Sequence, residues 1–204
     1  MHRRNPQTDS PVLAAARGRL RNSRGTSIVE FTLVLPLLLV MILALIEFGH
    51  LIQCRLIVAN VAREGGAIAS RTLTIDQSLA NLIAVSGHPL LLNSGVGKVV
   101  ITRIDAGDDP AGVAPTITTS VTSGSFGASS SISAGAGSMG LPANLYQHLI
   151  YRTGRPAPGV DGPDVTEMTV VEVFYNYLPI TPLFGFIPGL IPKTGLVLKS
   201  RAIF

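Results

Sequence analysis

The side chains that could support catalysis or metal binding are scattered along this sequence. The four histidines, His2, His50, His88 and His148, do not pair with one another at helical ligand spacing, and Cys54 is the one cysteine. We therefore expect no metal site and no cofactor. A single cysteine also excludes an intramolecular disulfide. We expect Cys54 to be a small buried residue, with an intermolecular bridge as the alternative.

The acidic and serine side chains do not form a catalytic pattern either. Five aspartates lie in segments typical of turns, where their side chains hydrogen-bond to the nearby backbone: Asp105, Asp108, Asp109, Asp161 and Asp164. No serine stands in a Gly-x-Ser-x-Gly elbow between a strand and a helix. We therefore predict that the protein is not an enzyme, and we assign no catalytic residue.

Glu30 is the one acid whose setting needs an explanation. It precedes an uncharged apolar run, Phe31 to Ile46, which with its apolar neighbours is long enough to span a bilayer core of about 30 Å as a helix. An unpaired carboxylate inside a membrane costs about 3 kcal/mol. Glu30 either has a cationic partner or reaches back to the cytoplasmic interface. Both alternatives predict a membrane-spanning helix.

Residues 1–25 form a basic leader in front of this helix. Six arginines and one acid, Asp9, precede Thr26, whereas the rest of the chain has ten basic and eleven acidic residues. The formal net charge of +4 therefore reflects the leader. Such a leader would lie on the cytoplasmic side of a membrane, so we expect no nucleic-acid partner. The residues after the apolar run do not fit a secretory cleavage site, and we expect cleavage before it, at Gly25.

The order of basic leader, Gly25, four residues, Glu30, Phe31 and apolar helix resembles the type IV prepilin class. With Thr26 as the first mature residue, Glu30 takes the fifth position that this class uses. Three further segments are similar to the TadE-like pseudopilins of Flp/Tad pili: Leu33–Leu39, Ile46–Gly49 and Asn60–Gly65. The resemblance is strong over residues 24–70 and resumes near the C-terminus.

This resemblance implies a minor pseudopilin that acts in assembly, priming or tip formation of an Flp/Tad-type pilus. Gly25 and Thr26 would be the processing site, and Glu30 and Phe31 would dock the subunit. After cleavage, the new α-amino group of Thr26 would be a cationic partner for Glu30, in the same subunit or in a neighbour. The implied partners are a prepilin peptidase, other pilins and minor pseudopilins, the inner-membrane assembly machinery and the lipid bilayer.

The implied location is the bacterial inner membrane, with the N-terminus in the cytoplasm and the C-terminal domain outside it. Incorporation into the pilus is left open. The alternative is an uncleaved, single-pass anchored binding module, such as an envelope sensor or adhesin, whose loops at 106–140 and 178–192 bind a ligand. The two interpretations differ in whether the leader is removed and whether Glu30 is needed.

The chain beyond the apolar run predicts an α+β fold. Apolar residues recur at a spacing of three to four as far as Ser70, so we expect a helix over residues 26–70. Pro36 should kink this helix. Gly65 and Gly66 each weaken it by about 1 kcal/mol, which allows a break there. We expect the small residues around this pair to pack against the protein's own domain, with a neighbouring subunit as the alternative.

Residues 71–204 are expected to form an extracytoplasmic domain with an antiparallel sheet of three or four strands, laid on the C-terminal half of the long helix. The patterns predict short helices at 76–85 and 144–152 and strands at 98–105, 117–121, 166–177 and 196–204. The Gly/Ser-rich segment 106–140 is expected to be a flexible loop. The apolar loop 178–186 should cover the edge of the core or face a partner.

Overall fold

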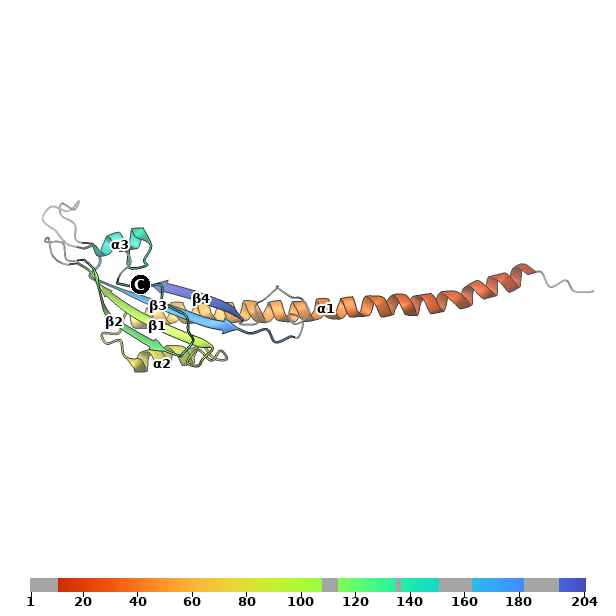
Figure 1. Ribbon diagram of the computed structural model, residues 1–204, viewed down its shortest axis with the longest axis horizontal. Helices are drawn as coiled ribbons and strands as arrows, with labels where there is room; N and C mark the ends of the chain where they lie inside the picture. Colours follow the sequence, from red (N-terminus) through yellow and green to blue (C-terminus); the bar gives the residue numbers. More distant parts are fainter. Residues whose placement is uncertain (1–10, 108–113, 135–136, 151–162, 182–194) are drawn as a thin grey trace, which may run out of the picture. The chain divides into compact units, whose positions relative to one another are not determined.

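The computed structural model describes residues 11–107, 114–134, 137–150, 163–181 and 195–204, with side chains from residue 25 onward. The chain forms two compact units, Met1–Phe48 and Gly49–Phe204. A continuous helix, α1 (Pro11–Ala69), runs through the junction between them (Figure 1). The predicted helix is therefore present, but it begins at Pro11, inside the expected leader, and not at Thr26.

α1 also passes through Gly65–Gly66 without the break that their low helix propensity suggested. The reason is tertiary packing. A Cβ atom at Gly65 would lie 2.6 Å from Cγ2 of Ile83, and one at Gly66 would collide with the ring of Phe204. The two glycines thus let other parts of the second unit approach the helix closely, and this packing offsets their conformational cost. The small-residue surface packs against the protein's own domain, as predicted.

The second unit contains a four-stranded antiparallel sheet in the order β2-β1-β3-β4. The strands are β1 (Gly97–Asp105), β2 (Thr116–Ser123), β3 (Glu167–Tyr177) and β4 (Leu196–Ile203). All four lie where the sequence patterns place them, although β2 extends beyond both ends of the predicted 117–121. The α+β fold is confirmed.

One face of the sheet packs on α1 and on α2 (Gln77–Ser86). α2 begins as predicted, because the Asp76 carboxylate accepts a hydrogen bond from the backbone N–H of Leu79 at 2.8 Å. Alternate residues of the central strands β1 and β3 contribute to this inner core, together with Cys54 of α1: Val99, Ile101, Val171 and Val173. Cys54 is buried, as expected for a small apolar residue.

The opposite, outer face of the sheet carries a second core cluster. There Ile104 and Val170 pack with Ile132 and Met139 of the connecting segment, and with Leu149 of α3 (Ala143–Leu149). Some residues of the segment 106–140, which was expected to be a flexible loop, are therefore packed on the sheet. Within it, residues 116–123 form β2, and Ile132 and Met139 are buried. Long-range apolar contacts thus hold Ile132 and Met139 on the sheet, although the composition around them is typical of a linker.

Arg103 of β1 caps the C-terminal end of α1. Its Nη1 donates to the carbonyl oxygen of Leu73 at 2.8 Å, and its Nη2 donates to those of Thr72 at 2.7 Å and Ala69 at 3.2 Å. Its Nε lies 3.7 Å from the Glu167 carboxylate. The last carbonyl groups of a helix have no partner within the helix. Arg103 therefore ties the sheet to the end of α1.

Replacing Arg103 with methionine should lower the free energy of unfolding by about 2 kcal/mol, since the apolar stem is kept and the charged hydrogen bonds are lost. Chemical unfolding of the protein in detergent micelles, followed by circular dichroism, measures this change. Arg63→Met, at an exposed position of α1, is the matched control and should change stability little. Equal losses in the two variants would contradict the capping role.

Candidate functional site

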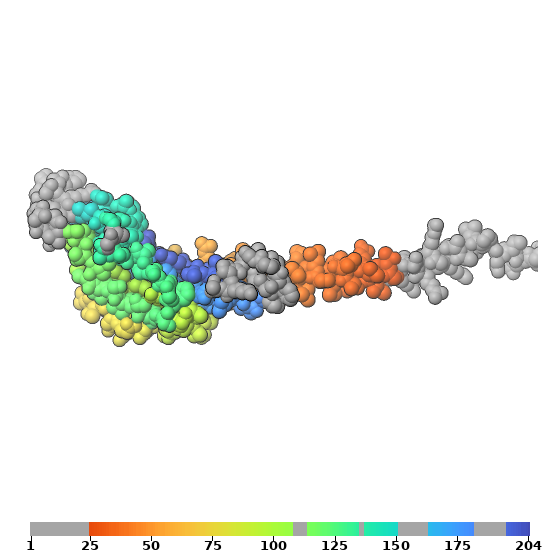
Figure 2. Space-filling model, viewed as in Figure 1, coloured from red at the N-terminus to blue at the C-terminus, as the bar shows by residue number. Residues whose placement is uncertain are grey.

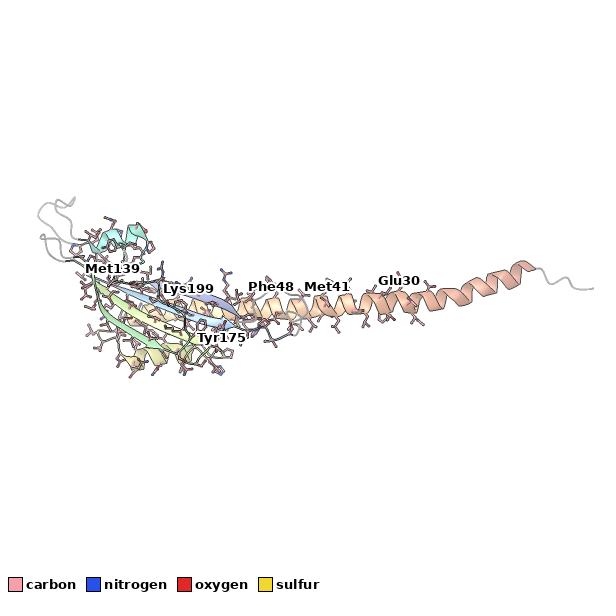
Figure 3. The ribbon with its side chains drawn as sticks, in the orientation of Figure 1. Glu30, Met41, Phe48, Met139, Tyr175 and Lys199 are labelled. Carbon is pink, nitrogen blue, oxygen red and sulfur yellow. The ribbon has the colours of Figure 1, made fainter. Side chains whose placement is uncertain are left out.

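The four residues singled out as the processing and docking site lie along two turns of α1, and Figure 3 labels Glu30 among them. Gly25, Thr26, Glu30 and Phe31 are all exposed. Thr26 and Glu30 are four positions apart, so the helix places them on the same face, about 6 Å apart along its axis. Their roles in processing and docking stay predictions.

The Glu30 side chain has no partner among the described residues. Its carboxylate makes no hydrogen bond or ion pair with any residue that the structure describes. The nearby Thr32 differs, because its hydroxyl donates to the carbonyl oxygen of Ile28 at 2.8 Å and is satisfied within the helix. Glu30 is thus a polar side chain, among apolar ones, that is available for a partner outside the described part of the chain.

The fold of the chain does not require glycine at position 25. A Cβ atom at Gly25 would meet no other atom within 4 Å, and Gly25 is part of α1. Glycine inside a helix costs about 1 kcal/mol relative to alanine. The packing of the described residues therefore does not account for glycine at this position. Gly49 is equally free of steric neighbours and offers a comparison.

The side chains of the apolar run after Glu30 are mostly exposed. Its large side chains are exposed except that of Leu43, which is half-buried, and no part of its most apolar window is buried. Figure 2 draws the atoms of this stretch in orange. By length and composition α1 can cross a membrane. This is compatible with a single-pass membrane anchor.

A second polar cluster, at the start of the Gly49–Phe204 unit, joins α1 to the end of β3. The His50 Nδ1 atom lies 3.4 Å from the Tyr177 hydroxyl, and the two rings are 5.5 Å apart. The Cys54 Sγ atom lies 3.6 Å from His50 Nε2. These contacts fix the position of β3 along the helix. Among the described residues, no group of three or more His, Cys, Asp or Glu side chains could hold a metal ion.

Glu172 is the centre of a buried network that the sequence patterns did not indicate. It lies on the outer face of β3 and is 1% exposed. Its carboxylate accepts hydrogen bonds from the hydroxyls of Ser130 and Ser131 and from the Ser131 backbone N–H, and Lys199 Nζ lies 3.4 Å away. Arg201, its cross-strand neighbour, donates to the carbonyl oxygen of Gly140 at 2.8 Å. The network holds the β2–α3 connection on the sheet.

Burial alone raises the pKa of the Glu172 carboxyl. The hydrogen bonds from Ser130 and Ser131 and the charge of Lys199 outweigh burial, so the pKa lies below its ordinary value. The carboxylate therefore stays ionised in the folded protein. In the sequence, Glu172 is only one residue of the predicted strand 166–177. The serines that bind it lie about forty positions away.

Replacing Glu172 with leucine should lower the free energy of unfolding by about 3 kcal/mol, because several donors lose their acceptor at once. Glu172→Gln, which keeps one acceptor oxygen, should cost less. Glu64→Leu, at an exposed position of α1, is the control for the change in side-chain type. Chemical unfolding in detergent micelles measures all three variants. A loss at Glu172 no larger than that at Glu64 would contradict the role of the network.

Acid should weaken the same network. Because the folded-state pKa of Glu172 is lowered, its contribution is complete above the ordinary glutamate pKa of about 4.3 and is lost as the pH falls through the folded-state pKa. The stability of the wild type should therefore fall more steeply in this acid range than that of Glu172→Leu. Unfolding curves recorded from neutral to acidic pH test this, and parallel curves would contradict it.

Comparison with known families locates the similarity in the N-terminal segment. Residues 25–67 match the family model described as TadE-like protein. The match begins at Gly25, and it covers the apolar helix and most of the part of α1 that packs on the sheet. Neither the curated proteins nor the solved structures gave a match. The resemblance to TadE-like proteins of the Tad/Flp pilus system is confirmed. Over residues 25–67, the chain is similar to the TadE-like family.

Proposed function

We propose that the protein is a minor pseudopilin that is cut between Gly25 and Thr26 and acts in assembly, priming or tip formation of an Flp/Tad-type pilus. The TadE-like match associates it with pilus components in general. The setting of Glu30 supports the more specific role of a processed minor pseudopilin. Glu30 stands without a partner among the described residues, on an uncovered apolar helix, five positions after a glycine that the packing does not need.

The chemistry of this arrangement depends on processing. Cleavage before Thr26 creates an α-ammonium group one helical turn from the Glu30 carboxylate. A carboxylate and an ammonium group in apolar surroundings are each costly alone, and together they neutralise one another. If the ammonium group of one subunit meets Glu30 of its neighbour, the pair sets the axial register between helices. Phe31 then lies beside the pair as part of the apolar contact.

The proposal includes partners and a location. The arginines before Thr26 favour a cytoplasmic leader, so the Gly49–Phe204 unit would lie outside the cytoplasm, with the protein in the inner membrane. A prepilin peptidase would cut it, and other pilins and the assembly machinery would receive it. Gly25 is a substrate position for the peptidase, and we propose a structural role for the protein, without catalysis.

Intact mass and N-terminal sequencing of the membrane-fraction protein test this proposal. The protein is produced with and without its cognate peptidase. A chain that begins at Thr26 only when the peptidase is present supports the pseudopilin role. A chain that keeps its leader in both samples would overturn it, and would favour the uncleaved, anchored binding module.

A further inference from the structure

Exposed apolar side chains gather at one end of the sheet. β3 ends at Tyr177, and β4 begins at its cross-strand partner Leu196, so the residues after β3 and the first residues of β4 share this end (Figure 1). Their exposed fractions are high for large apolar residues: Leu178 50%, Ile180 65%, Leu196 38% and Val197 52%. We call these four residues the apolar sheet end.

The apolar sheet end follows a residue that contacts the start of the Gly49–Phe204 unit. Tyr177, which directly precedes Leu178, has its hydroxyl 3.4 Å from His50 Nδ1. His50 follows Ile46, the last residue of the uncharged run, by four positions, which is about 6 Å along a helix. The His50–Tyr177 contact lies within the Gly49–Phe204 unit, and the spacing from Ile46 to His50 follows from the continuous helix. When the helix spans a bilayer, this end of the sheet is therefore at the membrane boundary.

The chemistry of this surface fits lipid better than water. Residues 178–181 and 195–198 contain no charged side chain, and the first charge on this part of β4 is Lys199. A cluster of exposed apolar residues is unfavourable in water and marks an interaction surface. At the membrane boundary, apolar side chains can enter the region between headgroups and acyl chains without leaving a charge unsolvated.

We infer that the apolar sheet end inserts into the extracytoplasmic face of the bilayer, so that the domain has a second membrane contact besides α1. This inference rests on the membrane anchor of the proposed function. The contact would hold the sheet at a fixed orientation on the membrane surface before the subunit leaves the membrane. The partner is the lipid bilayer itself, because lipid is present at this depth wherever α1 spans.

The sequence contains no tryptophan, so a single introduced tryptophan reports on its own surroundings. We would place it at Ile180 and, in a second variant, at Leu178, in the full-length protein reconstituted in phosphatidylcholine vesicles with acyl chains brominated near the headgroup. Leu73→Trp is the aqueous control, because Leu73 is 94% exposed and follows the far end of α1. Leu37→Trp, within the apolar run, reports on the anchor. Circular dichroism confirms that each variant is folded.

We expect the emission of Ile180→Trp and Leu178→Trp to shift to shorter wavelength and to be quenched by the brominated lipid. Leu73→Trp should show neither change. Quenching at Leu37 without quenching at Leu178 and Ile180 would overturn the inference and leave the anchor standing. Absence of quenching at all of these positions would overturn the anchor as well. A shift to shorter wavelength without quenching would mean that protein covers the surface, and would also overturn the inference.

Discussion

Replacing Glu30 with leucine is expected to abolish pilus assembly while leaving processing and membrane insertion intact. The substitution makes the helix more apolar, so insertion should not suffer. It removes the one carboxylate near the start of the apolar run. The ammonium group of Thr26 then has no counter-charge, and a subunit has nothing polar to fix its axial position against its neighbours. An uncompensated charge at this depth costs about 3 kcal/mol, enough to block a weak docking step.

Thr32→Leu is the matched control for Glu30→Leu. Thr32 is also a polar residue of the same helix, but its hydroxyl is satisfied by the Ile28 carbonyl. This variant should assemble pili normally. The measurements are electron microscopy of surface pili and intact mass of the membrane-fraction protein. Normal piliation in Glu30→Leu would contradict the docking role, even if the protein is processed after Gly25.

Replacing Gly25 with valine is expected to stop processing, so that the chain keeps residues 1–25. The described residues offer no steric reason for this effect, because a Cβ atom at position 25 meets none of their other atoms within 4 Å. Any block must therefore come from the active site of the peptidase, which would have to accommodate a branched side chain next to the scissile bond. The expected readout is an intact mass that corresponds to the complete precursor.

Gly49→Val tests whether the effect is specific to the cleavage position. Gly49 lies in the same helix and also has open space around its Cα, so both variants exchange an exposed helical glycine for the same residue. Gly49→Val should be cut normally. Cleavage of Gly25→Val after residue 25 would mean that position 25 does not select the site. Loss of cleavage in both variants would point to a general defect in insertion.

These two variants separate two steps of the proposed pathway. Glu30→Leu should give a processed chain that does not assemble, whereas Gly25→Val should give an unprocessed chain that lacks the Thr26 ammonium group. If the ammonium group and Glu30 form one pair, then adding Glu30→Leu to Gly25→Val should not worsen assembly further. An additional defect would indicate that Glu30 has another partner.

Features decided over short distances along the chain were predicted well. The Asp76 cap and the apolar spacing after it define α2, and β-branched alternation defines β1 and β3. The apolar run and its arginine-rich leader indicated a membrane-spanning helix, which α1 can form. In each case, the residues that determine the conformation lie within one or two turns or a single strand, so local propensity and periodicity decide the outcome.

Sequence patterns did not predict several features that depend on contacts between distant residues. Gly65 and Gly66 looked like a helix break, but Ile83 and Phe204 fill the space that the glycines leave. The composition of residues 106–140 is typical of a flexible loop, but Ser130 and Ser131 within it donate hydrogen bonds to the Glu172 side chain, about forty positions away. The role of Arg103 at the end of α1 likewise required the register of β1 on the helix.

The membrane-spanning run and the proposed cleavage motif of the N-terminal segment can thus be recognised from consecutive residues, because both depend on local composition and order. The packing of the domain, in contrast, depends on residues that are distant in the sequence. Which buried polar groups find partners, and which apolar residues remain exposed at the end of the sheet, depends on which strands meet. Only the tertiary structure brings Tyr177 to His50 and so places the end of β3 near the start of the Gly49–Phe204 unit.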